Sequence, residues 1–230
     1  LWFSKMQVFN DPFEGKMDLT AKGTFKEFLQ YFKDIDKLSE ISEDKLIELA
    51  KNASNNPKFF ENRLKSVKAN IDGKHGVCCF TTEINNILMW SHYADKHQGI
   101  CLKYDLLKLI DDDRLPFKVE YTRNFPKINY IQDYRHSIKL GREIFKKKAL
   151  DWEYEQEWRI IKMGASGRIN INQQSIEEII LGCKTDRKSE VGKQLIEMAS
   201  NQKIKVSEMV MSHESYKIKK TAGNNGYTQC

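Results

Sequence analysis

The residues that could carry chemistry are concentrated in three short segments, of which the most informative is acidic. It reads Trp152-Glu-Tyr-Glu-Gln-Glu-Trp-Arg-Ile-Ile. If this segment is a strand, alternation places Glu153, Glu155, Glu157 and Arg159 on one face, with successive carboxylates roughly 6.5 to 7 Å apart. Like charges at that spacing repel unless a cation, a substrate hydroxyl or an arginine compensates them. The pattern indicates either an acidic binding face or an exposed edge strand protected by charge.

The opposite face of the same predicted strand is aromatic. Trp152 and Trp158 point to that side, together with the tyrosine and isoleucine that alternate with them. We therefore expect both tryptophans to be substantially buried, and their truncation to be costly. A run of three lysines that ends at Lys148 precedes the segment and could compensate its carboxylates.

The second segment is Met89-Trp-Ser-His-Tyr-Ala94, which reads as part of a helix. On a helix His92 and Tyr93 share one face, and Trp90 lies on the neighbouring face. Imidazole, phenol and indole groups together suit the stacking of a planar ring with a hydrogen bond to its edge. An aromatic helix stripe also fits a hydrophobic core, so both interpretations stay open.

The third segment is Asn10-Asp-Pro-Phe-Glu14. The residue before a proline avoids the helical region, and Asn or Asp caps its own backbone, so the segment is turn-forming. One interpretation is a turn that caps a helix. The other places Asn10, Asp11 and Glu14 at the rim of a pocket.

The elements that must position these segments predict an α+β fold. Phe25, Phe28, Leu29 and Phe32 recur at the spacing of one helical face, and residues 22–70 read as helices. Further helices are expected at residues 85–94, 137–150 and 189–200. Strands are expected at residues 76–81, 99–105, 117–121, 154–162, 176–182 and 204–209. The order of these elements favours one domain over residues 1–230. Its sheet is expected to be mixed or antiparallel, in one piece or split in two, with helices at its sides. The helical segment near the N-terminus is expected to be an insertion.

Composition excludes several classes of protein. The chain has 230 residues, 40% of them hydrophobic, and no apolar run long enough to span a bilayer. Its 38 basic and 32 acidic residues give a net charge of +6. The protein is therefore expected to favour anionic partners only mildly, because the two signs of charge are mixed along the chain. Five cysteines without a Cys-x-x-Cys pair indicate buried, reduced thiols in a cytoplasmic protein rather than a disulfide scaffold or a zinc site. The start of the chain has no secretion signal. Because the chain opens on Leu1 and not on a methionine, we expect a segment upstream of it to be missing.

Taken together, these segments resemble the bacterial family DUF2971. The resemblance rests on Leu1-Trp-Phe-Ser, Asn10-Asp-Pro-Phe-Glu14, Cys79-Phe-Thr, Met89-Trp-Ser-His-Tyr-Ala with Gly99, Tyr121, and Lys148-x-x-x-Trp152-x-Tyr-Glu155-x-Glu157-Trp-Arg159. It runs from Leu1 to about Gly182, with the helical part before Asn70 variable. Because the family tends to begin with a short strand that contains Tyr and Arg, the resemblance implies that such a strand is missing upstream of Leu1. It implies an intracellular bacterial or phage-associated protein, with a role in antiviral defence or as a toxin and with partner proteins of a defence system.

A more distant similarity is to ADP-ribosyltransferases, which use a strand-borne glutamate beside the ribose of NAD. The Glu-x-Glu at 155 and 157 is similar to the glutamate element of that superfamily. This similarity implies NAD as substrate, Glu157 at the ribose and Glu155 orienting an acceptor that is a nucleic acid or a protein. Trp90 or Tyr93 would stack the ring. His92, Asn10, Asp11, Glu14, Lys148 and Arg159 would complete the binding site.

Two other functions stay open. A ligand-sensing or protein-interaction domain without chemistry would use the same aromatic and acidic segments as a pocket. A metal-dependent nuclease or hydrolase would place Asp11, Glu14, Glu155 and Glu157 around Mg²⁺. We expect the three segments to meet in one cleft if any of these functions applies.

Overall fold

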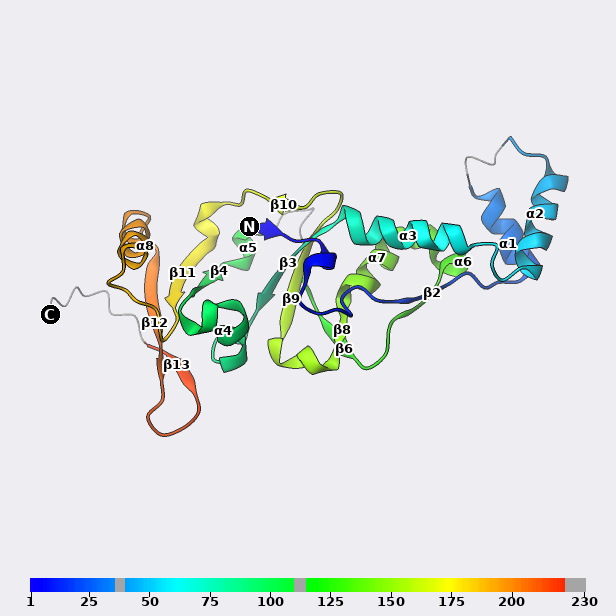
Figure 1. The fold of residues 1–230 in the computed structure, drawn as a ribbon. Coiled ribbons are helices and arrows are strands. Elements are labelled where there is room, and N and C mark those ends of the chain that lie inside the picture. Colours follow the sequence, from blue (N-terminus) through cyan, green and yellow to red (C-terminus); the bar gives the residue numbers. More distant parts are fainter. Residues whose placement is uncertain (36–39, 110–114, 222–230) are drawn as a thin grey trace.

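The computed structural model of the chain describes residues 1–35, 40–109 and 115–221, which form an α+β fold as the sequence predicts. The chain extends along one direction (Figure 1). Helices α1 (Phe25–Lys33) and α2 (Glu43–Asn55) lie at one end. Strands β3 (Gly76–Thr81) and β9 (Glu157–Lys162) lie in the middle, and helix α8 (Glu190–Asn201) lies at the other end.

The middle of the molecule is built on a three-stranded antiparallel sheet. Its order is β3-β9-β5, where β5 is Phe117–Lys118, so β9 is the central strand. The register pairs Arg159 of β9 with Cys79 of β3, and Glu157 with Thr81. Partners in register point to the same face of a sheet. The charged residues of β9 therefore project from a face of the sheet at its central strand, and β9 is not an edge strand.

Short elements surround this sheet and bring distant segments to it. The small sheets pair β1 with β10 in antiparallel fashion, and pair β2 with β7 and β6 with β8 in parallel. Their bounds are β1 Trp2–Phe3, β10 Gly167–Arg168, β2 Asp18–Thr20, β7 Lys127–Asn129, β6 Glu120–Thr122 and β8 Lys147–Ala149. The helices and turns between them are η1 Met6–Val8, α3 Glu61–Lys74, α6 Tyr130–Asp133, η4 Tyr134–His136, α7 Ser137–Lys146 and η5 Leu150–Glu155.

A four-stranded sheet forms the C-terminal part, in the order β13-β12-β11-β4. Its strands are β13 Ile218–Lys220, β12 Lys205–Met211, β11 Ile176–Leu181 and β4 Ile100–Tyr104. The elements beside it are α4 Ile87–Tyr93, η3 Asp95–His97, α5 Leu106–Leu109 and η6 Gln173–Ser175. Strands β11 and β12 are parallel and are connected through α8, whereas β4 and β13 run antiparallel to their neighbours. This sheet is therefore mixed, whereas the β3-β9-β5 sheet is antiparallel, which agrees with the prediction of a mixed or antiparallel sheet.

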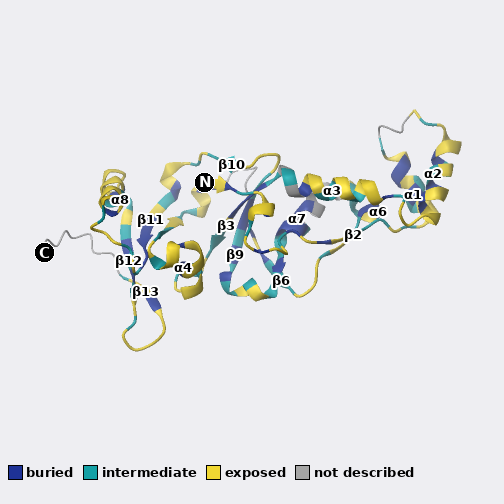
Figure 2. Cartoon of the chain, viewed as in Figure 1, coloured by how far each residue is buried: buried dark blue, intermediate teal, exposed yellow. Residues whose placement is uncertain are grey.

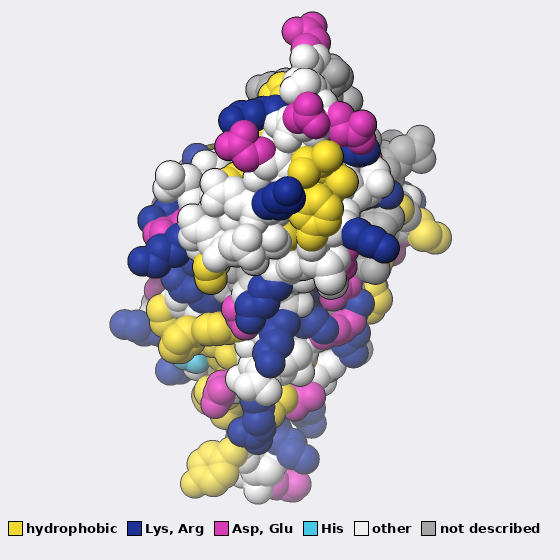
Figure 3. All heavy atoms as spheres, turned by 90° about the vertical axis from the view of Figure 1, so that its right-hand side faces the viewer, with side chains coloured by type: hydrophobic (Ala, Val, Ile, Leu, Met, Phe, Trp, Pro, Cys, Tyr) yellow, Lys and Arg dark blue, Asp and Glu magenta, His cyan; other side chains and the backbone are white. Residues whose placement is uncertain are grey.

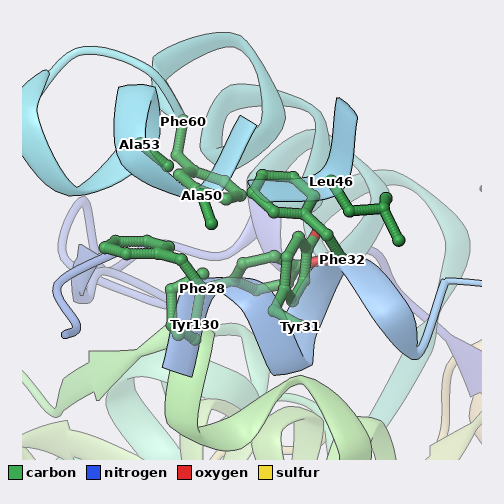
Figure 4. Packing of buried hydrophobic residues seen from close by; sticks show 9 residues of the cluster. Phe28, Tyr31, Phe32, Leu46, Ala50, Ala53, Phe60 and Tyr130 are labelled. Carbon is green, nitrogen blue, oxygen red and sulfur yellow. The ribbon is translucent and has the colours of Figure 1, made fainter. Parts of the chain in front are cut away.

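The N-terminal helical segment has an apolar core of its own, which we call the aromatic cluster. It consists of Phe28, Tyr31, Phe32, Leu46, Ala50, Ala53, Phe60, Tyr130 and Ile131 (Figure 4). Helix α1 begins at a capping box in which Thr24 and Glu27 each accept a hydrogen bond from the other's backbone N–H. The predicted apolar face of α1 is confirmed for Phe28 and Phe32, which are buried in this cluster, whereas Phe25 at the start of the helix is exposed.

The molecule has a buried interior and a surface of mixed charge, as the composition predicts. Buried residues follow the strands and the inner helix faces, and exposed residues follow the outer faces (Figure 2). Basic and acidic side chains are interleaved on the face that includes the α1–α2 end (Figure 3). Within the described residues, none of the helices has the length and apolar character that crossing a membrane requires.

One strand prediction is wrong in its first half. Residues 150–155 form the 3₁₀ helix η5, and the strand begins only at Glu157. Gln156 between them has φ 43° and ψ 51°, a left-handed conformation that no strand contains. The simple alternation of faces over Trp152–Arg159 is therefore interrupted at Gln156.

The expected burial of all cysteines is also corrected. Cys78 is buried, but Cys101 and Cys183 are half-buried and Cys79 is accessible to solvent. All four are free thiols, so the adjacent Cys78 and Cys79 do not bridge each other. Cys230 lies outside the described residues.

Candidate functional site

Five charged side chains from two distant parts of the chain meet in the middle of the molecule, and we call them the charged cluster. They are Glu14, Lys148, Glu155, Glu157 and Arg159. Each of these side chains is at most 4% exposed. All five were candidates from the sequence. The structure therefore brings together residues separated by more than 140 positions in the chain.

Arg159 lies at the centre of the cluster and is fully buried. Its Nη1 and Nη2 donate to the two oxygens of Glu14 at 2.7 and 2.9 Å, a paired arrangement that fixes the carboxylate. Its Nε donates to Glu157 Oε1 at 2.7 Å. Nη1 also donates to the backbone carbonyl of Phe145 in α7 at 2.8 Å. The guanidinium thus ties the N-terminal turn, α7 and β9 together.

Lys148 connects the two glutamates of the Glu-x-Glu pair. Its ammonium group donates to Glu155 and, at 2.8 Å, to Glu157 Oε2. Because Glu155 ends η5 and Glu157 begins β9, the left-handed Gln156 between them lets both carboxylates reach one ammonium group. The backbone N–H of Glu157 donates to the hydroxyl of Tyr121 on β6 at 2.7 Å, which anchors the start of the strand.

Tyr93 links this cluster to the molecular surface. Its hydroxyl donates to Glu155 Oε1 at 2.6 Å and accepts from the side-chain amide of Asn10 at 3.3 Å. The Tyr93 residue is 51% exposed, although its hydroxyl points to a buried carboxylate. The three sequence segments therefore converge, through Asn10, Tyr93 and the residues of the charged cluster.

Charge pairing dominates the electrostatics of the cluster. Burial raises the pKa of Glu157, but Arg159 and Lys148 outweigh it and hold that pKa at about 2. Burial lowers the pKa of Lys148, yet Glu157 and Glu155 raise it overall. Burial is the largest effect on Glu14 and raises its pKa despite Arg159. Three carboxylates face two cations in the cluster, and the pKa of Glu14 lies above its ordinary value.

The remaining candidate residues lie around the cluster or elsewhere. Asp11 is 4% exposed, and its Oδ1 accepts from the backbone N–H of Phe13 at 2.8 Å, as expected for a turn. Its buried Oδ2 has no hydrogen-bond partner among the described residues. His92 is exposed, and its ring contacts that of Tyr93 edge-on with centroids 6.2 Å apart.

The proposal that Trp90 stacks a ligand ring is wrong. Trp90 is 3% exposed and packs with Ile180, Met209 and Ile218 in a hydrophobic cluster. Its indole N–H donates to the backbone carbonyl of Ile84 at 2.7 Å. An indole whose faces and N–H are occupied by the core cannot accept a ligand, so of the aromatic pair only Tyr93 reaches the charged cluster.

The expected burial of Trp152 and Trp158 is wrong as well. Both residues are half-buried, whereas Glu155, Glu157 and Arg159 on the opposite face are buried. The cause is the position of β9 in the middle of its sheet, where buried cations compensate the carboxylates. The Trp152 ring instead lies 5.0 Å from the ammonium nitrogen of Lys148, a cation–π contact.

A basic pocket opens beside the charged cluster and shares Lys148 with it. Its volume is about 250 Å³, and its cationic side chains are Lys16, Arg123, Lys147 and Lys148. Phe13 and Phe125 line it as two exposed rings with centroids 6.2 Å apart. The sequence prediction missed Lys16, Arg123 and both phenylalanines. Only Phe13 carried a signal, as part of the Asn10–Glu14 turn.

Part of the chain, which includes most of the charged cluster, matches a known family model. Residues 89–160 match the model of DUF2971, which is described as a protein of unknown function. The DUF2971 match contains Tyr93, Lys148, Glu155, Glu157 and Arg159. It leaves out the turn that carries Asn10 and Glu14. Neither the curated proteins nor the solved structures include a significant match to the chain.

The carboxylates of the cluster are arranged for ion pairing within the protein. Among the residues that the structure describes, no group of three or more His, Cys, Asp and Glu side chains is placed to hold a metal ion. The oxygens of Glu14 and Glu157 accept from Arg159 and Lys148 instead. The geometry therefore gives no support to the metal-dependent nuclease hypothesis.

Proposed function

We propose that the protein binds NAD or a related nucleotide in the basic pocket and acts on it as an ADP-ribosyltransferase-like enzyme. The observation that carries the proposal is that Lys148 lines the pocket and also pairs with both glutamates of the Glu-x-Glu element. A bound nucleotide would thus lie next to carboxylates that can stabilise a positively charged ribose. The acceptor in this proposal is a protein or a nucleic acid.

The composition of the pocket suits a phosphorylated ligand with a planar ring. Lys16 and Arg123 are exposed and form no ion pair with any described residue, so both can bind phosphate oxygens. Lys147 already pairs with Glu120. The adjacent rings of Phe13 and Phe125 offer an apolar surface on which a base or a nicotinamide can stack.

Burial assigns the two glutamates different roles within this proposal. Both oxygens of Glu157 accept from buried cations, so it positions Lys148 and Arg159. One oxygen of Glu155 accepts from Tyr93, which is half exposed. Movement of the Tyr93 hydroxyl away from Oε1 would open Glu155 to a ribose hydroxyl. We therefore assign the catalytic carboxylate to Glu155 and reverse the roles that the sequence suggested.

Nicotinamide release tests the chemical part of the proposal. We expect Glu155→Gln to slow the release about a hundredfold to a thousandfold, because a carboxylate acts mainly when positive charge develops. The affinity for NAD, measured by calorimetry, should change little. Cell extract should be present as the source of acceptor.

Calorimetry with pocket variants tests the binding part. Arg123→Ala and Lys16→Ala should each weaken NAD binding about tenfold, a loss typical of one charge-assisted contact. Lys188→Ala, an exposed lysine in the C-terminal part, is the matched control and should leave the affinity unchanged. Failure of the parent protein to bind NAD at millimolar concentration would refute the proposal.

A second candidate is a domain that binds a nucleotide without chemistry. It is favoured by the engagement of every oxygen of Glu155 and Glu157 by protein donors, as in a structural network. Binding of NAD that depends on Arg123, without nicotinamide release under any condition, would support this candidate over the enzyme.

A further inference from the structure

A second set of reactive side chains lies in the C-terminal part of the molecule, away from the charged cluster. Strands β4 and β11 pair so that the residues before β4 meet those after β11. This pairing places Cys183 Sγ 3.7 Å from His97 Nδ1. On the other side of the ring, Ser91 Oγ of helix α4 lies 3.0 Å from His97 Nε2. Ser91 and His97 come from one stretch of the chain, and Cys183 comes from another stretch 86 positions after His97.

The hydrogen bonds determine which nitrogen of His97 carries the proton. The Ser91 hydroxyl donates to the backbone carbonyl of Ile87 at 3.0 Å, so its oxygen is left to accept from His97 Nε2–H. In neutral imidazole the other nitrogen, Nδ1, then has a free lone pair directed at the Cys183 thiol. Burial, with a smaller effect of Lys184, lowers the pKa of His97 and favours this neutral form. This is the order of nucleophile, base and orienting group that activates thiols.

The backbone at residues 95–97, which carries His97, has an unusual conformation. Asp95, Lys96 and His97 have φ values of 43°, 53° and 74°, three successive non-glycine residues in the left-handed region. Such conformations cost free energy and persist where the surrounding structure imposes them. Here the His97 carbonyl accepts from Lys184 N–H at 3.0 Å. A Cβ on Gly182 would lie 2.1 Å from that carbonyl oxygen, so only glycine allows the approach.

A pocket of about 320 Å³ adjoins the pair and indicates what could react there. Cys183, His97 and Ser91 line it, together with the exposed apolar side chains of Ile87, Leu88 and Met211. Among the described residues that line it, the charged ones are Lys184 and Lys217. The pocket therefore suits an apolar chain whose far end is neutral or anionic.

We propose that Cys183 is a nucleophile that takes an acyl group from an activated acyl donor, with His97 as its base. The thiol proton moves to His97 Nδ1 while Sγ attacks the carbonyl carbon of the donor. The bond from that carbon to the leaving oxygen or sulfur then breaks, and the leaving group receives the proton. The product is a thioester on Cys183, with the acyl chain against Ile87, Leu88 and Met211. Ser91 is a positioning residue.

Acylation by 4-nitrophenyl butyrate tests this proposal on the full chain. We expect release of one equivalent of 4-nitrophenol and a butyryl group on Cys183, located by peptide mass spectrometry and removed by hydroxylamine. Cys183→Ser should lose this adduct. His97→Asn should slow it about a hundredfold, the usual contribution of a general base. Asn is chosen because it tolerates positive φ values.

Cys101→Ser is the matched control, because Cys101 is also half-buried, and its thiol forms no hydrogen bond with a histidine among the residues that the structure describes. In this variant, 4-nitrophenyl butyrate should acylate Cys183 at the same rate as in the parent protein. If thermal unfolding shows that His97→Asn does not fold, Ser91→Ala replaces it and should slow acylation about tenfold without lowering the melting temperature. Acylation of Cys183 no faster than that of Cys101, or an unchanged rate in the folded variant, would overturn the proposal.

Discussion

The aromatic cluster and the charged cluster are both buried, but they stabilise the fold in opposite ways. In the aromatic cluster, Phe60 contacts Phe28 with ring centroids 5.6 Å apart and Tyr31 at 5.3 Å, and any ring that fills the space contributes. Apolar burial has no required direction. In the charged cluster, each partner is indispensable because a buried charge without its counter-ion costs several kcal/mol. A single substitution in the aromatic cluster therefore removes apolar contacts, whereas one in the charged cluster leaves a buried charge without its partner.

The difference also separates stability from chemistry. The aromatic cluster contains little that responds to solvent, whereas the charged cluster is connected through Tyr93 and Lys148 to the surface and to the basic pocket. Packing apolar residues of similar volume would stabilise the centre at least as well as ion pairs do. We infer that the charges are kept for their contribution to the proposed ligand site.

The largest effect is expected from Arg159→Leu. It removes two hydrogen-bond donors from Glu14 and two from Glu157, and should lower the free energy of unfolding by about 3 to 5 kcal/mol. Denaturant unfolding measures the change. The double variant Arg159→Leu with Glu14→Gln should recover part of the loss, because the uncompensated carboxylate is gone. No recovery would mean that Arg159 acts through packing alone.

An intermediate effect is expected from pH. The folded protein holds the pKa of Glu157 at about 2 against an ordinary 4.5, so the charged carboxylate stabilises the fold above about pH 4.5. This stabilisation is lost as pH falls towards 2. The difference in unfolding free energy between the parent and Glu157→Gln should shrink by about 2 to 4 kcal/mol over that interval.

The aromatic cluster supplies the control for this pH experiment. Phe60→Ala should cost about 3 to 5 kcal/mol at every pH in the same interval. The raised pKa of Glu14 acts in the opposite sense to that of Glu157, which is why the difference from Glu157→Gln is measured and not the parent alone. A constant difference between the parent and Glu157→Gln would contradict the ion pairing of Glu157.

The smallest effect is expected from Trp152→Ala. Trp152 is half-buried and contacts Lys148 through its ring face, so its loss should cost about 1 kcal/mol, the scale of one cation–π contact plus partial burial. Thermal unfolding measures this. A cost near that of Phe60→Ala would show that Trp152 belongs to the core after all.

Local sequence patterns determined most of the helices and strands. The spacing of Phe25, Phe28, Leu29 and Phe32 predicted α1, and alternation or apolar runs predicted β3, β4 and β11. Turn chemistry at Asn10–Glu14 and the clustering of charges at residues 148–159 also indicated the residues of the charged cluster. These features are local, because the period of an element and the shape of a turn depend on neighbouring residues.

Only the tertiary structure decided which face of each element is buried. Trp152 and Trp158 were expected inside, because a pattern assigns the apolar face to the core by default, and the pattern left open whether Glu155 and Glu157 form a binding face or an exposed edge. Buried cations from β8 and β9 reverse that default, and the left-handed Gln156 breaks the alternation. The pairing of Cys183 with His97 had no sequence signal either. Contacts of this kind depend on strand register, which joins residues that are far apart in the chain.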